Sequence, residues 1–184
     1  MPLLRDGYAI LAVAGSFTMT HNHALLASAL VITVAIIAAT GGCKDRSQST
    51  LTDLGASHAK YKPGQVWHYR SRAGEEQSTL TILKVESHPK LGTIVHVGLE
   101  GLRIKNAKAP AGVTDTATHL PFSEKSINDS VTTLANPSGP VPDYHDGYNT
   151  WRKSFDAGKA GVFTITVAEA VDAMARAIEN AKPE

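Results

Sequence analysis

The order of the patterns along the chain predicts an α+β fold. Short runs rich in β-branched and aromatic residues fill residues 64–106, and turn residues separate them. Apolar residues at helical spacing dominate the part after residue 120. Because strands come first and helices follow, we expect a small antiparallel sheet of about four to five strands packed against two to three C-terminal helices.

Four segments carry the strand pattern. The runs GQVWHYR (64–70) and STLTILKVE (78–86) flank a polar loop, and TIVHVGLE (93–100) follows a turn that contains Pro89. Two glycines then allow a turn into LRIKN (102–106). Short strands joined by turns at this spacing predict an antiparallel meander.

A first helix is predicted after a long polar loop. Residues 107–119 have little apolar content and include Lys-Ala-Pro-Ala-Gly, so we expect a loop there. Ser123 is a suitable N-cap for a helix that ends near Pro137. The expected buried stripe of this helix is Ile127, Val131 and Leu134.

A proline-rich loop and a second helix come next. Residues 137–144 (PSGPVPDY) contain three prolines, which favour an irregular loop. Residues 146–157 place aromatic residues at helical spacing, and Gly158 is expected to end the helix. Those aromatic residues are Tyr148, Trp151 and Phe155.

The chain is predicted to finish with a strand and a helix. GVFTITV (161–167) is rich in β-branched residues, which favours a strand. Thr166 and Glu169 form a capping-box pattern at the start of the last helix. Its apolar stripe is expected to be Val167, Val171, Met174 and Ile178.

The composition argues against several classes of function. The 184-residue chain has a formal net charge of +1, with its basic residues scattered, so we expect no nucleic-acid partner. No G-x-S-x-G, H-E-x-x-H, P-loop or G-x-G-x-x-G pattern occurs, and neither a catalytic residue nor a cofactor is predicted. The one cysteine excludes an internal disulfide framework.

That cysteine lies in a distinctive setting. Residues 24–39 are apolar and without charge, small residues follow at Thr40, Gly41 and Gly42, and the chain turns polar directly after Cys43. This succession resembles the lipobox of bacterial lipoproteins. The pattern departs from the family at Thr40, where leucine is preferred.

The resemblance implies an anchor and an address. It implies a signal peptide over 1–42, cleaved before Cys43, and a lipid on that cysteine. It further implies retention at the outer membrane, facing the periplasm, because Lys44 rather than aspartate follows the cysteine. Translation from Met19 instead of Met1 would give a more normal signal length.

Two alternatives remain for this segment: cleavage by ordinary signal peptidase, which leaves a free thiol, or an uncleaved membrane anchor. Beyond it we expect a flexible tether over 43–60 and one globular domain over 61–184.

The histidines are weak candidates for a metal site. His68 and His96 lie on predicted strands and could face each other, whereas His119 and His145 lie in predicted loops. None of them has metal-ligand spacing, so locally hydrogen-bonded histidines are the simpler interpretation and no metal site is predicted. The Glu75-Glu76 pair is most simply a solvated turn.

The aromatic residues are expected to form core. The simplest arrangement packs the helix over 146–157 onto a sheet that presents Trp67, with a ligand groove as the alternative. The loops 107–119 and 137–144 are better candidates for recognition, because loops of this length on a small scaffold often bind partners.

These observations favour a non-enzymatic binding domain on an envelope lipoprotein, with an unidentified protein partner. The alternatives are an immunity or inhibitor lipoprotein directed against a secreted toxin, and an enzyme with an unrecognised site. The segments PGQVWHYR (63–70) and FDAGKAGVFTITVAEAV (155–171) resemble an uncharacterised bacterial family, and no activity comes with that resemblance.

Overall fold

The computed structural model describes residues 51–181. The predicted lipid attachment at Cys43, the cleavage region Thr40–Gly42 and the start at Met1 or Met19 lie outside the described residues. Within residues 51–181, no helix is both long and apolar enough to cross a membrane.

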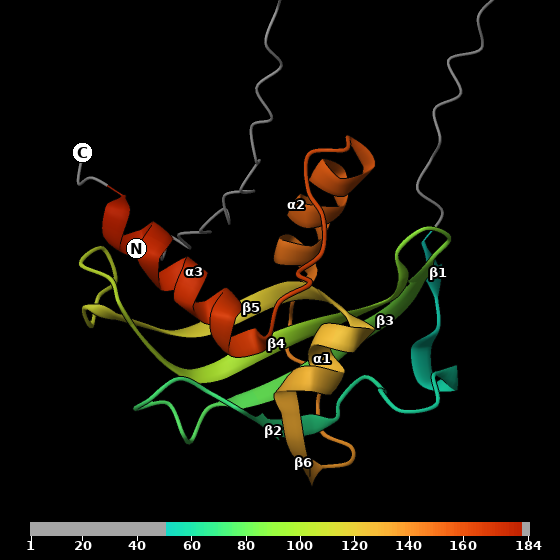
Figure 1. Ribbon diagram of the computed structural model, residues 1–184, viewed down its shortest axis with the longest axis horizontal. Helices are drawn as coiled ribbons and strands as arrows, with labels where there is room; N and C mark the ends of the chain where they lie inside the picture. Colours follow the sequence, from blue (N-terminus) through green and yellow to red (C-terminus); the bar gives the residue numbers. More distant parts are fainter. Residues whose placement is uncertain (1–50, 182–184) are drawn as a thin grey trace, which may run out of the picture.

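The described part is an α+β fold, as predicted, with a six-stranded antiparallel sheet and three helices (Figure 1). The strand order is β5-β4-β3-β2-β6, and β1 pairs with the far end of β3. The strands are β1 (Thr52–Asp53), β2 (Val66–Tyr69), β3 (Thr79–His88), β4 (Gly92–Lys105), β5 (Val113–Ser123) and β6 (Val131–Asn136). The helices are α1 (Glu124–Ser130), α2 (His145–Asp156) and α3 (Val167–Asn180).

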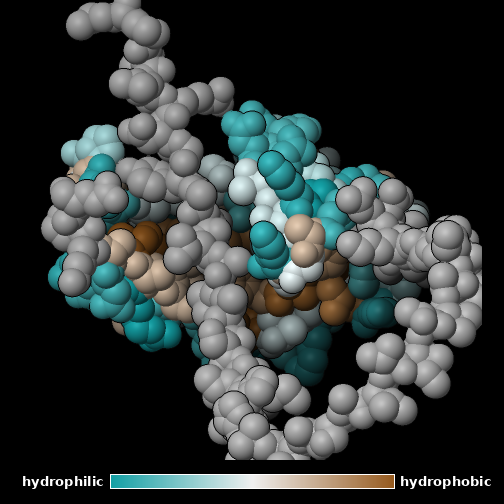
Figure 2. Space-filling view, turned by 90° about the horizontal axis from the view of Figure 1, so that it is seen from above, coloured by the Kyte–Doolittle hydropathy of each residue, from teal (hydrophilic) through white to brown (hydrophobic). Residues whose placement is uncertain are grey.

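The two faces of the sheet are covered by different helices. Successive residues of a strand point to opposite faces, so Val95 and Val97 of β4 join the main core while Ile94 and His96 face α2. The main core contains eighteen buried apolar residues from the sheet, α1 and α3, whereas the cluster under α2 contains three. Figure 2 shows hydrophilic residues on the raised parts of one side of the molecule and hydrophobic residues between them. The apolar cluster between α2 and the sheet is thus the smaller of the two.

The capping predictions for two helices are confirmed. The Ser123 hydroxyl accepts a hydrogen bond from the Ser126 backbone N–H at the start of α1. At the start of α3, Thr166 and Glu169 form both halves of the capping box. Gly158 follows α2 with φ +69°, the left-handed conformation that a helix terminator adopts.

Three strand predictions need correction. The predicted strands 93–100 and 102–106 form one strand, β4, because Gly101 (φ +76°) produces a register shift instead of a turn. The predicted loop 107–119 contains the first part of β5 (Val113–Ser123), whose threonines favour an extended backbone despite their polarity. The predicted strand 161–167 is reduced to one bridge, Phe122 with Phe163.

The first helix is shorter than predicted. It ends at Ser130, and Val131–Asn136 becomes β6. The β-branched run Val-Thr-Thr favours a strand there, and β2 offers a free edge with which it pairs. Leu134 is therefore exposed on β6 and does not continue a buried helical stripe.

The folded part also begins before residue 61, where the sequence placed the end of a flexible tether. Thr52 and Asp53 pair with Ser87 and Glu86 of β3, and a short 3₁₀ turn covers 55–57. This start of the fold brings the Asp53 carboxylate to the sheet surface beside Lys84.

Ser130 ties α1 to the start of α3. Its hydroxyl donates to the Ser126 carbonyl (2.6 Å) and accepts from the Val167 backbone N–H (2.9 Å), and Ser130 is buried. We expect Ser130→Ala to lower the free energy of unfolding by about 1–3 kcal/mol, because it leaves a buried N–H without a partner. Chemical denaturation measures the change. Ser138→Ala, at an exposed position, is the control; an equal effect of the two variants would contradict this role.

Candidate functional site

Two of the four candidate histidines lie together. His96 on β4 and His119 on β5 approach each other with His96 Nδ1 2.9 Å from His119 Nε2, and both are buried. The prediction that His119 lies in a loop is wrong, because β5 begins at Val113.

The other two histidines are elsewhere. His68 is exposed on β2 and faces Thr79, and β3 separates its strand from β4, so it cannot face His96 as expected. His145 is exposed at the first position of α2, where its Nδ1 contacts an Asp143 oxygen at 2.9 Å. Among residues 51–181, no three His, Cys, Asp or Glu side chains are grouped so that they could hold a metal ion.

Glu86 extends the histidine pair into a longer polar row. His96 Nε2 lies 3.0 Å from a Glu86 carboxylate oxygen. The ring N–H is not aligned with that oxygen, so Nε2 is buried without a hydrogen bond within the described part of the chain. The Tyr148 hydroxyl of α2 donates to the same carboxylate, at 2.9 and 3.1 Å from its two oxygens.

The row reaches the surface through a lysine. Lys84 Nζ lies 3.6 Å from Glu86 Oε1 and forms an ion pair with Asp53 of β1. Asp53, Lys84, Glu86, His96 and His119 therefore form a continuous polar row across β1, β3, β4 and β5. Its outer end is exposed and its inner end is enclosed.

Helix α2 covers the inner end. The rings of Tyr144, Tyr148 and Trp151 pack against the His119 ring with centroid distances of 6.5, 5.7 and 5.8 Å. His96 is 0% exposed and His119 is 3% exposed as a result. The aromatic residues of α2 thus form core, as expected, but over the histidines; Trp67 packs against Tyr61 of the main core.

Gly147 allows α2 to come this close. A Cβ at this position would lie 2.8 Å from His119 Cβ, closer than real carbon atoms approach. A glycine inside a helix lowers helix stability by about 1 kcal/mol relative to alanine. The close contact with β5 explains why glycine is nevertheless suited to this position.

Burial determines the charge state of the histidines. Burial lowers the pKa of His119 to about 3, with the nearby His96 adding to the effect. Burial also lowers the pKa of His96, although Glu86 acts in the opposite direction. Both rings are therefore neutral near pH 7, and one ring donates its proton to the other across the 2.9 Å contact.

The carboxylate is charged. Burial alone would raise the pKa of Glu86, but His96, the Tyr148 hydroxyl and Lys84 outweigh it and hold the pKa below its ordinary value. Burial raises the pKa of Tyr148, and its hydrogen bond to Glu86 adds to this shift. The row therefore carries alternating charge at its outer end and neutral rings at its inner end.

An open groove of about 610 Å³ lies over the outer end of this row. One wall comes from the strands and the segments beside them, and includes Asp53, Pro63, Leu83 and Lys84. The other wall is the end of the proline-rich loop together with the start of α2, residues 141–145. Val141 is 41% exposed there, so an apolar side chain faces solvent beside the charged pair.

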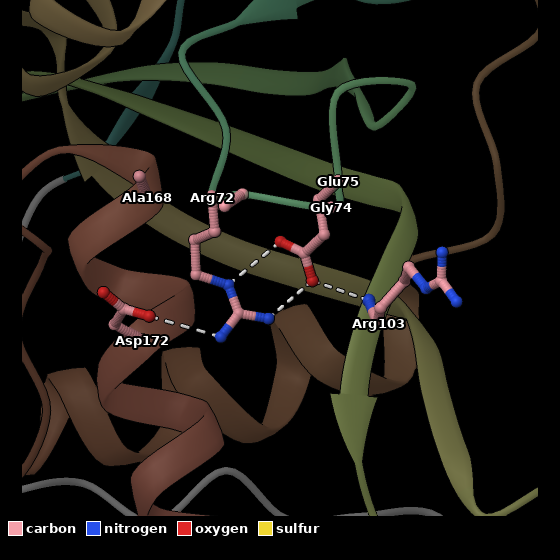
Figure 3. Close-up of a pocket in the computed structure, with 7 residues that line it drawn as sticks. Arg72, Gly74, Glu75, Arg103, Ala168 and Asp172 are labelled. Carbon is pink, nitrogen blue, oxygen red and sulfur yellow. Dashed lines mark hydrogen bonds and ion pairs between the residues drawn. The ribbon is translucent and has the colours of Figure 1, made fainter.

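A second open groove of about 580 Å³ lies at the other end of the sheet, beside α3 (Figure 3). The prediction that Glu75 belongs to a solvated turn is wrong: it is 3% exposed, and Arg72 binds it through two N–O contacts of 2.9 and 2.5 Å. Arg72 also pairs with Asp172 of α3 at 3.2 Å, and the Arg103 backbone N–H donates to Glu75. Arg72 thus bridges Glu75 in the β2–β3 loop and Asp172 in α3, and these ion pairs tie the loop to the helix.

Comparison with known proteins adds no relative. No protein-family model matches the chain, and neither the curated proteins nor the solved structures contain a significant match.

We predict that Gly147→Ala destabilises the protein by about 1–3 kcal/mol, because the new methyl group must push α2 away from His119. Helix propensity alone predicts the opposite sign, a gain of about 1 kcal/mol. Thermal and denaturant unfolding distinguish the two. Gly161→Ala is the matched control, since a Cβ there meets nothing within 4 Å; a stabilised Gly147→Ala variant would show that the contact does not constrain α2.

Proposed function

We propose that the chain is a bacterial envelope lipoprotein whose folded part is a non-enzymatic binding module for a protein partner. In this proposal a lipid on Cys43 holds the module at the outer membrane, facing the periplasm. The observation that carries the binding function is the open groove between β3 and residues 141–145, which combines an exposed apolar side chain with the Asp53–Lys84 ion pair.

The shape and chemistry of the groove suit an extended protein segment. The groove is open to solvent, and the proline-rich wall has a backbone with restricted φ, so less conformational entropy is lost when a partner binds. Val141 and Pro142 offer apolar contact, and the charged groups of Asp53, Lys84 and Asp143 offer directional pairing at the rim. Such a mixture is typical of transient protein interfaces.

The enclosed histidine pair supports a non-enzymatic role. His96, His119 and Glu86 are the residue types that transfer protons in enzymes. A general base must come within hydrogen-bonding distance of its substrate, and these three residues are at most 3% exposed. While α2 is in place they stabilise the fold and do not reach a substrate.

The groove is tested with a photo-crosslinking amino acid at His145, in cells that produce the full-length chain. We expect a discrete crosslinked partner that disappears when Val141→Asp is added, because a charge replaces the apolar contact. Ile165, which is also 41% exposed, is the control: Ile165→Asp should leave the crosslink in place. A crosslink that survives Val141→Asp, or is lost equally in both variants, would contradict binding in this groove.

The anchor is tested by intact-mass analysis of the protein from the membrane fraction. We expect an added lipid mass on a chain that begins at Cys43, and loss of both lipid and membrane retention in Cys43→Ser. Persistence of the lipid mass in this variant would rule out the cysteine anchor, and a chain that still carries residues 1–42 would show that the signal is not cleaved.

A further inference from the structure

We propose that α2 is a proton-operated cover: uptake of protons by His96 and His119 releases α2 from the sheet and so removes one wall of the groove. The value of such a device for the cell rests on the proposed binding function. The opening of α2 is a property of the chain alone and can be measured without any partner.

The histidine pair is built to exclude charge. The 2.9 Å contact between His96 Nδ1 and His119 Nε2 needs one nitrogen without a proton. If both rings were charged, both nitrogens would carry protons and the hydrogen bond would become a repulsive contact. Because the rings are enclosed, water cannot relieve that repulsion while α2 stays in place.

The groups around the pair do not compensate for two added charges. Glu86 of β3 offers one negative charge, but the N–H of His96 Nε2 is not aligned with it, and Lys84 already lies 3.6 Å from the same carboxylate. Asp53 of β1 is paired with Lys84. From α2 and its N-cap, the uncharged rings of Tyr148 and Tyr144 face the pair, and Arg152 lies beside Tyr148. Glu86 therefore partly balances the charge of one protonated histidine ring, and none of these groups balances the charge of a second.

Helix α2 is the element that we expect to leave the sheet when the histidines are protonated. Its cluster contains only three buried apolar residues, Ile94, Trp151 and Phe155, against eighteen in the main core, and Trp151 and Phe155 are each 9% exposed. Its remaining ties to the sheet include the Tyr148–Glu86 hydrogen bond and the packing of its aromatic rings on the two histidines. The charged rings would gain water as soon as α2 lifts, whereas β4 stays paired with β3 and β5 stays paired with β4.

The same helix shapes the groove. Tyr144 and His145 line the groove and are the N-cap and the first residue of α2, and Tyr144 stacks over His119. Displacement of α2 therefore moves the wall that faces Lys84. This connects the enclosed end of the polar row to the binding surface at its outer end.

The coupling between proton binding and the release of α2 has a definite sign and pH range. The docked state holds both histidines neutral, with the pKa of His119 at about 3, and in the released state each ring returns to an ordinary pKa of about 6.5. The released state therefore binds more protons below pH 6.5, and acid favours it. Between pH 7.5 and 5.5 His119 alone raises the released population about tenfold, and His96, whose pKa is also lowered by burial, raises it further. Glu86 keeps its charge in this range, since its pKa lies below its ordinary value.

Hydrogen exchange measures the release directly. We expect the protection of backbone amides in residues 145–156 of the full-length chain in detergent, corrected for intrinsic exchange rates, to fall by about tenfold or more between pH 7.5 and 5.5. Protection in β4 should stay constant over the same range. Equal loss of protection in α2 and β4 would indicate global unfolding, and constant protection in α2 would show that it is no cover; either result overturns the proposal.

Two variants identify the groups responsible. His119→Gln keeps a polar side chain beside His96 but cannot take a proton, so the fall in α2 protection should become about tenfold smaller than in the unaltered protein. His68→Gln, which changes an exposed histidine on β2, should behave as the unaltered protein. If His119→Gln does not fold, the comparison of α2 with β4 in the unaltered protein still decides the proposal. A failed crosslinking experiment with unaltered pH-dependent release would reject the binding function and leave the cover intact.

Discussion

His96 and His119 meet across neighbouring strands in a space from which water is excluded, and that space exists because a helix lies directly over it. Two neutral imidazoles can satisfy one another there through one shared proton, while two charged ones cannot. The position of α2, the closeness permitted by Gly147 and the shape of the groove beside Tyr144 all depend on this neutral pair. The main core does not depend on it, because α1 and α3 pack on the other face of the sheet.

The residues of the polar row have different roles because they are buried to different extents. At the outer end, Asp53 and Lys84 form an ion pair that solvent partly screens, so it contributes little to stability and is available to a partner. At the inner end, Glu86 cannot remain charged without support, and Tyr148 supplies a hydrogen bond from α2. The same helix thus shields the histidines and stabilises the carboxylate. This arrangement couples a buried polar network to a surface on which binding can take place.

The sequence predicted correctly those elements that depend on interactions between residues close together in the chain. The α+β class, the two capping motifs and the aromatic helix follow from residue order, hydroxyl and carboxylate spacing, and helical periodicity. The errors arose where tertiary pairing outweighed local signals: the threonine-rich β5 has little apolar content, and β6 exists because β2 has a free edge. Gly101 carries an irregularity within a strand, which a sequence pattern cannot distinguish from a turn.

The candidate site was only half visible in the sequence. His96 and His119 were recognised as candidates, but their pairing depends on the register between β4 and β5, which residue spacing does not encode. Glu86, Tyr148 and Gly147 were missed for the same reason, although two charged residues at alternate positions of one strand, Lys84 and Glu86, were a usable signal of a polar face.

The central claim is that the enclosed pair of His96 and His119 is neutral. The imidazole ¹⁵N chemical shifts of His96 and His119 at pH 7 test it most directly: the account predicts one protonated and one unprotonated nitrogen in each ring, and imidazolium shifts for either ring would contradict it.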